Sequence, residues 1–381
     1  MKVIHLVLGK ANPERMNGVN KVVHKLASVQ HDQGIDVEVW GLSNDLEHNY
    51  PERNFTTRLF LQHRLQGFLD RKLVAAIGQL KRPAIFHLHG AFIPTFYSVH
   101  RQLVKRSLPY VMTPHGALAP GAMQQSPYLK AFYLRLFERS LLRRARVVQL
   151  LGWSGFENAA RLAPQCQRIL IPNGQDLREL PELPAPDNAC VHFVFCGRLD
   201  RYHKGLDLFL EGFAQFQRAG GKGRVGLIGN GKDRAFLERL VGQLDIGAAV
   251  EFYGARFGAE KFQFIRRGDV FFRTSRMEGF PMAVLEAAGM GLPCLVSEAT
   301  NMGSYIGDYR AGRVLMENTA SAIAEALGRL EQAHRNGQLS RMGKNARLMV
   351  TEQFNWEDIA RRLYEVYTEN NKVDQPMPSL S

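Results

Sequence analysis

Two cations follow the apolar run HFVFC in the segment GRLDRYHKG, residues 197–205. In parallel α/β sheets ligands bind beyond the carboxyl ends of the strands, so polar groups placed directly after a strand are candidates for binding. Arg198 is expected at the strand end and Lys204 at the start of the next helix, where the helix N-terminus also favours an anion. Glycines near both cations permit close backbone approach, which favours a bound diphosphate over the alternative of two solvated turn charges.

Two carboxylates eight positions apart form a second candidate site in SRMEGFPMAVLEAAGMGLP, residues 275–293. Glu278 is predicted in the loop after the strand DVFFRT, and Glu286 in the helix that follows, so that both face one cleft at different depths. Two acceptors at different depths suit two sets of hydroxyl groups. Gly279 and Phe280 bring free backbone donors to the helix start, and Pro281 is expected at the first helical position. Paired Glu residues also occur on solvated helices, but the otherwise apolar window disfavours that interpretation.

A histidine follows the strand candidate YVMT, in the sequence PHG. His115 is therefore a third candidate for chemistry. His5, His87 and His89 also lie in or directly after strands, and a histidine in such a place is often a satisfied core residue. The position of His115 beyond a strand end favours the functional interpretation.

Alternating strands and helices must position these residues. Both halves of the chain begin with an apolar strand, a glycine-bearing turn and a helical pattern, which predicts two doubly wound α/β units with parallel sheets and right-handed crossovers. The further strand candidates are VEVWGL, IFHLHG, YVMT, VVQLL and RILIP in the first half and GRVGLIG, VEFYG, DVFFRT and PCLVS in the second. Helical patterns are expected near residues 68–80, 94–106, 128–144, 232–243, 259–266 and 283–290.

The length of 381 residues predicts two domains. The proline-bearing segment DLRELPELPAPDNA is expected to be an exposed linker, which places the domains at residues 1–183 and 184–370. A helix over residues 356–370 is predicted to pack back on the first domain. The polar tail 371–381 is predicted to be disordered.

Taken together, GRLDRYHKGLDLFL, GNGKD at 229–233, VEFYG at 250–254 and the Glu-x7-Glu segment resemble the retaining family 4 glycosyltransferases. TPHGALAPGA and IPNG in the first half are typical of the same family. The resemblance implies a GT-B fold, in which two Rossmann-like domains face each other across a cleft. The first domain would bind the acceptor and the second the nucleotide sugar.

The resemblance also implies the residue roles. Arg198 and Lys204 would bind the donor diphosphate, Glu286 the ribose hydroxyls, and Glu278 the transferred sugar, with His115 at the reaction centre. The family's first loop carries paired glycines, whereas this chain has Met16, Asn17 and Gly18. The full set of donor-binding residues that the resemblance implies is Gly18, Gly197, Arg198, Lys204, Gly229, Asn230, Gly254, Arg256, Glu278, Gly279, Phe280, Pro281 and Glu286.

The expected reaction is transfer of a sugar from a nucleotide diphosphate sugar to a hydroxyl acceptor with retained configuration. A bacterial cell-surface polysaccharide or a lipid-linked oligosaccharide is the preferred acceptor class. An epimerase or phosphorylase of the same architecture is the alternative within the enzymes. A dinucleotide oxidoreductase is disfavoured because no GxGxxG follows the first strand.

No cofactor and no metal are expected. The chain contains no Asp-x-Asp, the usual metal-clamping motif of the other major glycosyltransferase fold. Cationic side chains and helix termini would then stabilise the leaving diphosphate, which predicts metal-independent activity. The four cysteines show no metal-ligand or disulfide spacing.

The net charge of +13 indicates an anionic partner. Residues 1–185 carry 24 Lys and Arg against 13 Asp and Glu, whereas the remainder carries 25 against 23. With the basic amphipathic pattern YLKAFYLRLFERSLLRRARVV, this asymmetry suggests docking on an anionic membrane surface. A nucleic-acid-binding protein is a distant alternative, since no recognisable binding module is present. The absence of a long apolar run predicts a cytoplasmic protein, peripheral on the inner face of the cell membrane if it docks there.

Overall fold

The computed structural model describes residues 1–14, 18–63, 67–80, 83–182 and 186–368. The chain forms two compact units, one comprising Met1–Asn173 with residues 356–368 and the other Gly174–Asn355. The boundary therefore lies about ten residues before the predicted one at 183/184. The predicted tail over 371–381 lies outside the described residues.

The first unit contains a seven-stranded sheet of order β3-β2-β1-β4-β5-β6-β7, with every neighbouring pair parallel. Parallel strands need crossover connections, which helices supply here except between β2 and β3, where residues 44–55 form an irregular connection. Its elements are β1 (Lys2–Leu8), α1 (Gly18–Asp32), β2 (Val37–Ser43), β3 (Thr56–Leu61), α2 (Arg71–Gln79), β4 (Ala84–His89), α3 (Pro94–Lys105), β5 (Tyr110–Thr113), α4 (Pro120–Met123), α5 (Pro127–Tyr133), the π-helical turn η1 (Leu134–Glu138), α6 (Arg139–Arg144), β6 (Val147–Leu150), α7 (Trp153–Leu162), β7 (Arg168–Leu170) and α16 (Trp356–Thr368).

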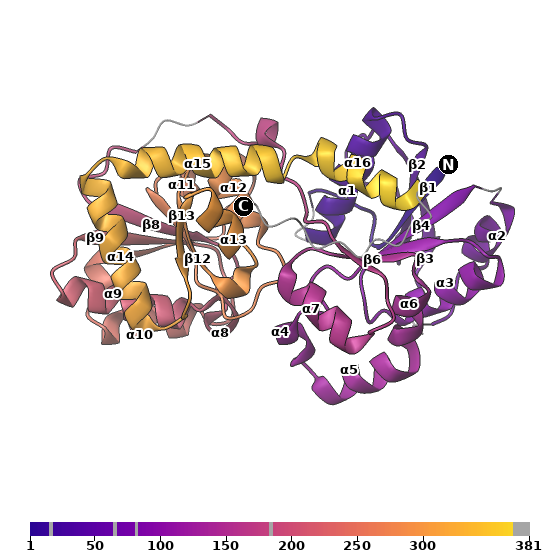
Figure 1. Cartoon of the computed structure of the whole chain (residues 1–381), viewed down its shortest axis with the longest axis horizontal. Helices are drawn as coiled ribbons and strands as arrows, with labels where there is room; N and C mark the ends of the chain where they lie inside the picture. The colour runs from indigo at the N-terminus through magenta and orange to yellow at the C-terminus, as the bar shows by residue number, and fades with distance from the viewer. Residues whose placement is uncertain (15–17, 64–66, 81–82, 183–185, 369–381) are drawn as a thin grey trace. The chain divides into compact units, whose positions relative to one another are not determined.

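Helices bury both faces of this sheet. One core joins alternate strand residues such as Ile4 and Phe86 to α2, α3, α6 and α7. The other joins the intervening residues, such as Val3 and Ile85, to α1 and α16. Helix α16 lies beside α1 in Figure 1, although more than 320 residues separate them in sequence. Burial on both faces explains the nearly continuous apolar runs of the central strands.

The helix expected over 128–144 runs through α5, η1 and α6, and the residues at both junctions keep the right-handed helical conformation. The π-helical turn η1 lies inside this helix and shifts the helix face by its extra residue. Leu141 and Leu142 are buried, whereas Leu129 and Phe132 are 69% and 62% exposed. The predicted helix is confirmed, and the π-helical turn within it was not predicted.

The second unit contains a six-stranded sheet of order β10-β9-β8-β11-β12-β13, again parallel throughout. Its elements are the 3-10 turn η2 (Leu177–Glu179), β8 (Val191–Cys196), α8 (Arg201–Lys204), α9 (Leu206–Arg218), β9 (Gly223–Ile228), α10 (Arg234–Gln243), η3 (Gly247–Ala249), β10 (Val250–Gly254), α11 (Gly258–Ile265), β11 (Val270–Arg273), α12 (Met282–Gly289), β12 (Cys294–Ser297), η4 (Glu298–Thr300), α13 (Gly303–Asp308), β13 (Gly312–Leu315), α14 (Ala320–Arg335) and α15 (Gln338–Gln353).

Two cores again cover the sheet. Helices α9, α10 and α14 pack on one face around Phe195 and Phe272, and α12, α13 and α15 pack on the other around Val194 and Phe271. Part of the segment expected to be an exposed linker belongs to this unit, because Leu180 is 6% exposed and packs in the second core. Residues 183–185 lie outside the described part of the chain. No helix within the described residues is long and apolar enough to cross a membrane.

Candidate functional site

The carboxyl ends of β8, β9 and β10 are tied together by backbone contacts. Gly197 N–H donates to Ile228 C=O at 2.9 Å, and Gly229 N–H donates to Gly254 C=O at 2.8 Å. A Cβ atom at Gly229 would lie 1.9 Å from Gly197 O, so only glycine fits there. Asn230 C=O accepts from Leu199 N–H at 3.0 Å. The predicted residues Gly197, Gly229, Asn230 and Gly254 thus lie together at the carboxyl ends of these strands, where ligands of such folds bind.

Lys204 lies at these strand ends as the last residue of the short helix α8. The prediction that it opens the next helix was wrong, because Gly205 adopts a left-handed conformation, with φ of +64°, and separates α8 from α9. A Cβ atom at Gly205 would lie 1.9 Å from Thr274 O, so this turn packs tightly against the end of β11. The turn directs Lys204 Nζ toward Glu278, whose Oε1 and Oε2 lie at 3.0 and 2.8 Å.

Arg273 is a functional candidate that the sequence interpretation missed. It is the last residue of β11 and only 6% exposed. Its Nη1 donates to Cys196 C=O at 3.2 Å, and its Nε lies 3.3 Å from Glu278 Oε2. The run VFFRT could have revealed it, since an arginine at the end of a buried strand needs a counter-charge.

Glu278 is therefore held by two cations and a hydroxyl, Ser275 Oγ donating to it at 3.1 Å. Burial alone would raise the pKa of Glu278, but Arg273 and Lys204 keep it below the ordinary value. Burial lowers the pKa of Lys204, with Arg273 adding to the effect and Glu278 opposing it. Glu278 is ionised at neutral pH and neutralises part of the positive charge of Lys204 and Arg273.

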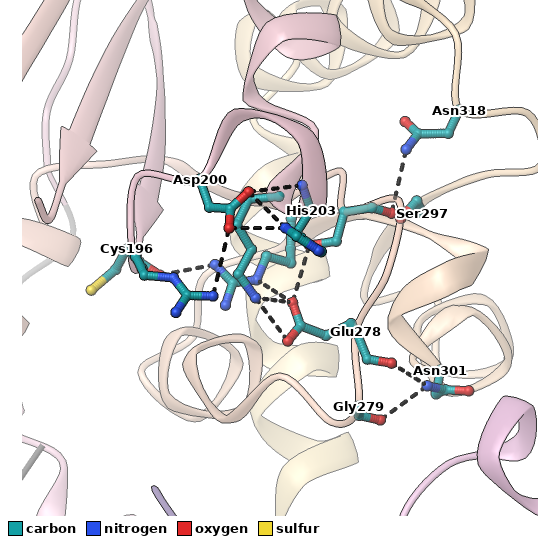
Figure 2. Close-up of polar contacts among 12 residues, drawn as sticks. Cys196, Asp200, His203, Glu278, Gly279, Ser297, Asn301 and Asn318 are labelled. Carbon is teal, nitrogen blue, oxygen red and sulfur yellow. Dashed lines mark hydrogen bonds and ion pairs between the residues drawn. The ribbon is translucent and has the colours of Figure 1, made fainter. Parts of the chain in front are cut away.

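Arg198 does not bind Glu278 in the described structure. Its side chain is 70% exposed and lies 3.6 Å from Asp200 Oδ2. Asp200 is buried, and His203 N–H and Nδ1 contact its carboxylate at 3.0 and 2.9 Å (Figure 2). Arg198 is therefore an accessible cation near the carboxyl ends of the same strands, with Asp200 as its partner. Lys204 is largely buried and is paired with Glu278.

The loop before α12 has its carbonyl groups bound by side chains. Asn301 Nδ2 donates to the carbonyl groups of Glu278 and Gly279 at 3.3 and 3.0 Å (Figure 2). Asn318 and Ser297 donate to Ser275 C=O at 3.3 and 2.6 Å. Asn301 itself adopts a left-handed φ of +60°. Neither Asn301 nor Asn318 was predicted, because both are distant in sequence from the loop that they hold.

With the carbonyl groups bound, the loop's amides remain available. Among the described residues, the backbone N–H groups of Glu278, Gly279 and Phe280 have no hydrogen-bond acceptor. Helix α12 begins at Met282, one residue after the predicted start, so Pro281 precedes the helix. Consecutive free N–H groups at a helix start bind anions and hydroxyl oxygens.

Glu286 lies on α12 and is paired separately from Glu278. Its Oε1 accepts from Lys261 Nζ of α11 at 2.7 Å. Arg256, another predicted donor-binding residue, donates from Nε to Tyr253 C=O at 3.0 Å and from Nη1 to Glu260 at 2.8 Å. Glu286 is thus paired with Lys261, whereas Glu278 is paired with Lys204 and Arg273. The sequence did not indicate these separate pairings.

His115 and Gly18 belong to the first unit. His115 has a positive φ of +49° and is followed by Gly116 at +81°, a strained pair typical of functional sites. Its Nε2 lies 3.1 Å from His89 Nδ1, and burial lowers its pKa to about 4. Gly18 begins α1, is exposed, and has no atom within 4 Å of an added Cβ. Met16 and Asn17 lie outside the described residues.

The structure is a doubly wound α/β protein in which cationic side chains and free backbone amides lie at the carboxyl ends of the strands of the second sheet. The sequence profile described as glycosyl transferases group 1 matches residues 186–349, and the profile described as glycosyl transferase 4-like domain matches residues 17–174. The chain belongs to the glycosyltransferases of GT-B fold.

Curated relatives include the putative colanic acid biosynthesis glycosyltransferase WcaL of Escherichia coli, 28% identical over 166 residues, and the amylovoran biosynthesis glycosyltransferase AmsK of Erwinia amylovora, 28% identical over 169 residues. These matches cover 42% and 43% of this chain and 41% of each relative. Among solved structures, Anabaena HepE in complex with UDP superposes with a TM-score of 0.74 at 15% identity, covering 96% of this chain and 99% of that one. Sucrose-phosphate synthase from Thermosynechococcus elongatus gives 0.72 at 20% identity, covering 96% and 98%.

Proposed function

We propose that the protein is a retaining glycosyltransferase that moves a sugar from a nucleotide diphosphate sugar to a hydroxyl acceptor. One observation carries the proposal: Glu278, held by Lys204 and Arg273, is followed by Gly279 and Phe280, whose backbone amides are free in the loop before α12. Cations suit a diphosphate, and a carboxylate with amides suits sugar hydroxyls. HepE, which shares the fold, has been crystallised with UDP and with UDP-glucose.

In this proposal Lys204, Arg198 and Arg273 stabilise the leaving diphosphate. Glu278 and the amides of Gly279 and Phe280 bind the transferred sugar. The bond between the anomeric carbon and the phosphate oxygen breaks, and the acceptor oxygen bonds to the same face of that carbon. The departing phosphate oxygen takes the acceptor's proton, so no side chain acts as nucleophile. His115 orients the donor sugar.

The roles of the two carboxylates can be separated by calorimetry with a nucleoside diphosphate. Glu278→Ala should reduce turnover strongly without weakening nucleoside diphosphate binding. Glu286→Ala should weaken nucleotide binding, because a carboxylate that accepts two ribose hydroxyls is lost. Equal effects of both substitutions on affinity and turnover would contradict this division.

We propose that no metal takes part. Three cations, Lys204, Arg198 and Arg273, already lie at the carboxyl ends of the strands where the diphosphate would leave. Turnover should be unchanged in EDTA. A strict requirement for magnesium or manganese would contradict the proposal.

The acceptor is proposed to be a growing surface polysaccharide or a lipid-linked oligosaccharide. The support is the names of the matched relatives, which refer to colanic acid and amylovoran synthesis. A thermal-shift panel of nucleotide sugars would first identify the donor. Release of nucleoside diphosphate that depends on the acceptor would then distinguish transfer from epimerisation.

We also propose that α5 docks on an anionic membrane. Tyr128, Leu129 and Phe132 are 90%, 69% and 62% exposed, and the exposed Arg135 and Arg139 follow them. Exposed apolar side chains beside basic ones are typical of interfacial helices. Flotation with anionic liposomes at low salt should recover the protein, and Phe132→Asp should reduce recovery. The control Leu348→Asp, at an exposed leucine of α15, should not; equal recovery of both variants would contradict the proposal.

A further inference from the structure

A stripe of polar side chains crosses the buried sheet of the first unit. Adjacent strands contribute His5 from β1, His87 and His89 from β4, Thr113 from β5 and Gln149 from β6, each at most 3% exposed. They lie on the face covered by α1 and α16, because they alternate with the residues of the opposite core and share the face of Val3, Ile85, Val111 and Val147. A buried polar row must be satisfied internally.

One end of the row is fixed by a backbone carbonyl. Gln149 Nε2 donates to Ile171 C=O at 2.9 Å, and Thr113 Oγ1 donates to Gln149 Oε1 at 2.6 Å. His87 Nε2 lies 2.6 Å from Thr113 Oγ1, and His87 Nδ1 lies 2.7 Å from the Tyr367 hydroxyl of α16. A carbonyl can only accept, and a hydroxyl has one proton to donate. Thr113 must therefore accept from His87 Nε2–H.

The row continues from α16 through α1 to the strand-end histidine. Gln30 Nε2 donates to the Tyr367 hydroxyl at 3.5 Å, the longest link, and Gln30 Oε1 lies 2.7 Å from His5 Nε2. His5 Nδ1 lies 2.8 Å from His89 Nε2, and His89 Nδ1 lies 3.1 Å from His115 Nε2. The contacts form one unbroken path from Ile171 C=O to His115.

The four imidazoles are neutral at physiological pH. Burial lowers the pKa of His5 and of His115 to about 4 and lowers the pKa of His87 and of His89 well below the ordinary value. A neutral imidazole donates from one nitrogen and accepts at the other. A neutral histidine therefore passes on the direction of the hydrogen bond that it receives.

The direction of every bond then follows from Ile171 C=O. Because His87 Nε2–H donates to Thr113, His87 Nδ1 must accept from the Tyr367 O–H. Tyr367 must then accept from the Gln30 amide N–H, which turns Gln30 Oε1 toward His5 and requires His5 Nε2–H.

The same rule carries the direction to the end of the path. His5 Nδ1 accepts from His89 Nε2–H, and His89 Nδ1 accepts from His115 Nε2–H. We propose that this path fixes His115 in the Nε2–H tautomer and presents its Nδ1 as a hydrogen-bond acceptor, with His89, His5, Gln30 and Tyr367 as positioning residues. The use of that acceptor on the donor sugar rests on the proposed function.

The cluster His5, His87 and His89 also has the spacing of a metal site, with ligand atoms within 4.8 Å of one another. All six of its ring nitrogens already have hydrogen-bond partners. A metal ion would have to break these bonds, so the cluster is assigned to positioning. Stoichiometric zinc, iron or copper in the purified protein by elemental analysis would overturn that assignment.

The tautomers can be measured directly. Long-range 1H–15N correlation spectra of protein labelled with [15N]histidine distinguish Nδ1–H, Nε2–H and doubly protonated rings among the 12 histidines. Single His→Gln substitutions assign the signals. We expect His5, His87, His89 and His115 all to be neutral Nε2–H at pH 7. An Nδ1–H ring or a charged ring among the four would overturn the proposal.

Tyr367→Phe cuts the path with the loss of one oxygen atom. His87 remains anchored through Thr113, so it should keep the Nε2–H tautomer and serve as an internal control. Gln30 loses the partner that orients it, so His5, His89 and His115 should each show both tautomers. A His115 that stays entirely Nε2–H in this variant would overturn the anchoring by Tyr367. Tyr364→Phe, on the same helix, is the matched control and should leave all four rings unchanged.

Activity provides a separate readout. In Tyr367→Phe the turnover number should fall roughly two- to tenfold, as the competent tautomer is depopulated, with unchanged nucleoside diphosphate affinity. If the tautomers scramble and turnover stays unchanged, the role of His115 in the proposed function fails while the anchoring path stands. If the tautomers do not scramble, the path fails whatever the turnover.

Discussion

At the scale of single residues, the second unit shows how a buried carboxylate can hold a cationic site together. The Glu278 side chain is 11% exposed, and the side chains of Lys204 and Arg273 are 14% and 7% exposed. Removing one partner of such a group leaves the other charges buried and unpaired, which costs more than the pair itself contributes. In the proposed function, these cations are the charges that a diphosphate would meet.

Glu278→Gln should therefore destabilise the second unit by about 2–4 kcal/mol. Added nucleoside diphosphate should raise the melting temperature of the variant more than that of the wild type, because the anion replaces the lost carboxylate. Differential scanning calorimetry with and without the nucleotide measures both effects.

The matched control is Glu325→Gln, which breaks the more exposed pair between Glu325 and Arg329 on α14. It should cost at most about 0.5 kcal/mol and show no extra nucleotide effect. A similar loss in both variants would contradict the buried-charge argument.

The buried histidines predict a pH dependence. Because burial lowers the pKa of His5 to about 4, the unfolded imidazole binds a proton between about pH 6.5 and 4 that the folded one does not. The free energy of unfolding of the first unit should therefore fall as the pH falls, by about 1.4 kcal/mol per pH unit for each such histidine.

Tryptophan fluorescence in urea can measure this slope, since Trp40, Trp153 and Trp356 all belong to the first unit. His5→Gln should reduce the slope by the contribution of one proton, about 1.4 kcal/mol per pH unit. Substitution of the exposed His31 to Gln should leave the slope unchanged. An unchanged slope in His5→Gln would show that this ring titrates normally.

At the scale of elements, the loop between β11 and α12 is shaped by side chains from distant segments. Asn301 follows η4 and Asn318 precedes α14, and both donate to carbonyl groups of residues 274–279. Binding of the carbonyl groups leaves the N–H groups at the start of α12 facing away from those partners. The helix start is thus prepared for a ligand before one binds.

Two substitutions at Asn301 separate its side chain from its backbone conformation. Asn301→Gly keeps access to the left-handed φ and loses the bonds to the loop, so donor affinity should fall while stability changes little. In Asn301→Ala the alanine must also adopt the unfavourable left-handed conformation, so this variant should be about 1–2 kcal/mol less stable than Asn301→Gly. Calorimetric donor affinity and urea unfolding measure the two effects; equal stability of both variants would contradict the conformational part.

The elements themselves were largely predictable. The central strands were expected from their apolar runs, because both faces are buried. The edge strands β3 and β13 were missed, because each has only one buried residue and its apolar pattern is therefore weak. The π-helical turn η1 was missed since the sequence YLKAFYLRLFERSLLRRARVV continues a helical period through it, and an extra residue in a helical turn leaves no compositional sign.

At the scale of the whole molecule, the first unit is built from two separate stretches of chain. Helix α16 supplies Trp356, Ile359, Leu363 and Tyr367 to the core that α1 shares. Each large side chain contributes roughly 1.5–3 kcal/mol when buried, so the helix accounts for much of the stability of a unit of this size. In the sequence, the second unit is one continuous segment, residues 174–355, between these two stretches.

Residues 174–355 expressed alone should therefore fold and bind a nucleoside diphosphate. Residues 1–173 should not fold stably alone, and residues 356–368 fused through a flexible linker should restore the fold. Circular dichroism and thermal melting test all three proteins. A stable fragment of residues 1–173 would show that α16 is dispensable.

The sequence by itself determined what depends on neighbouring residues. The apolar runs specified the strands, the glycine-bearing turns specified the strand ends, and the motifs containing Lys204, Glu278 and Glu286 lie in short contiguous segments. These features were predictable because local burial and local conformation set them.

Tertiary structure decided what depends on distant partners. It added Arg273 to Glu278, gave Glu286 its own cation, Lys261, and brought Tyr367 to His87, 280 positions away in the chain. A hydrogen bond or ion pair between segments leaves no periodicity in either segment. Its existence is set by sheet order and helix packing, which only the folded chain establishes.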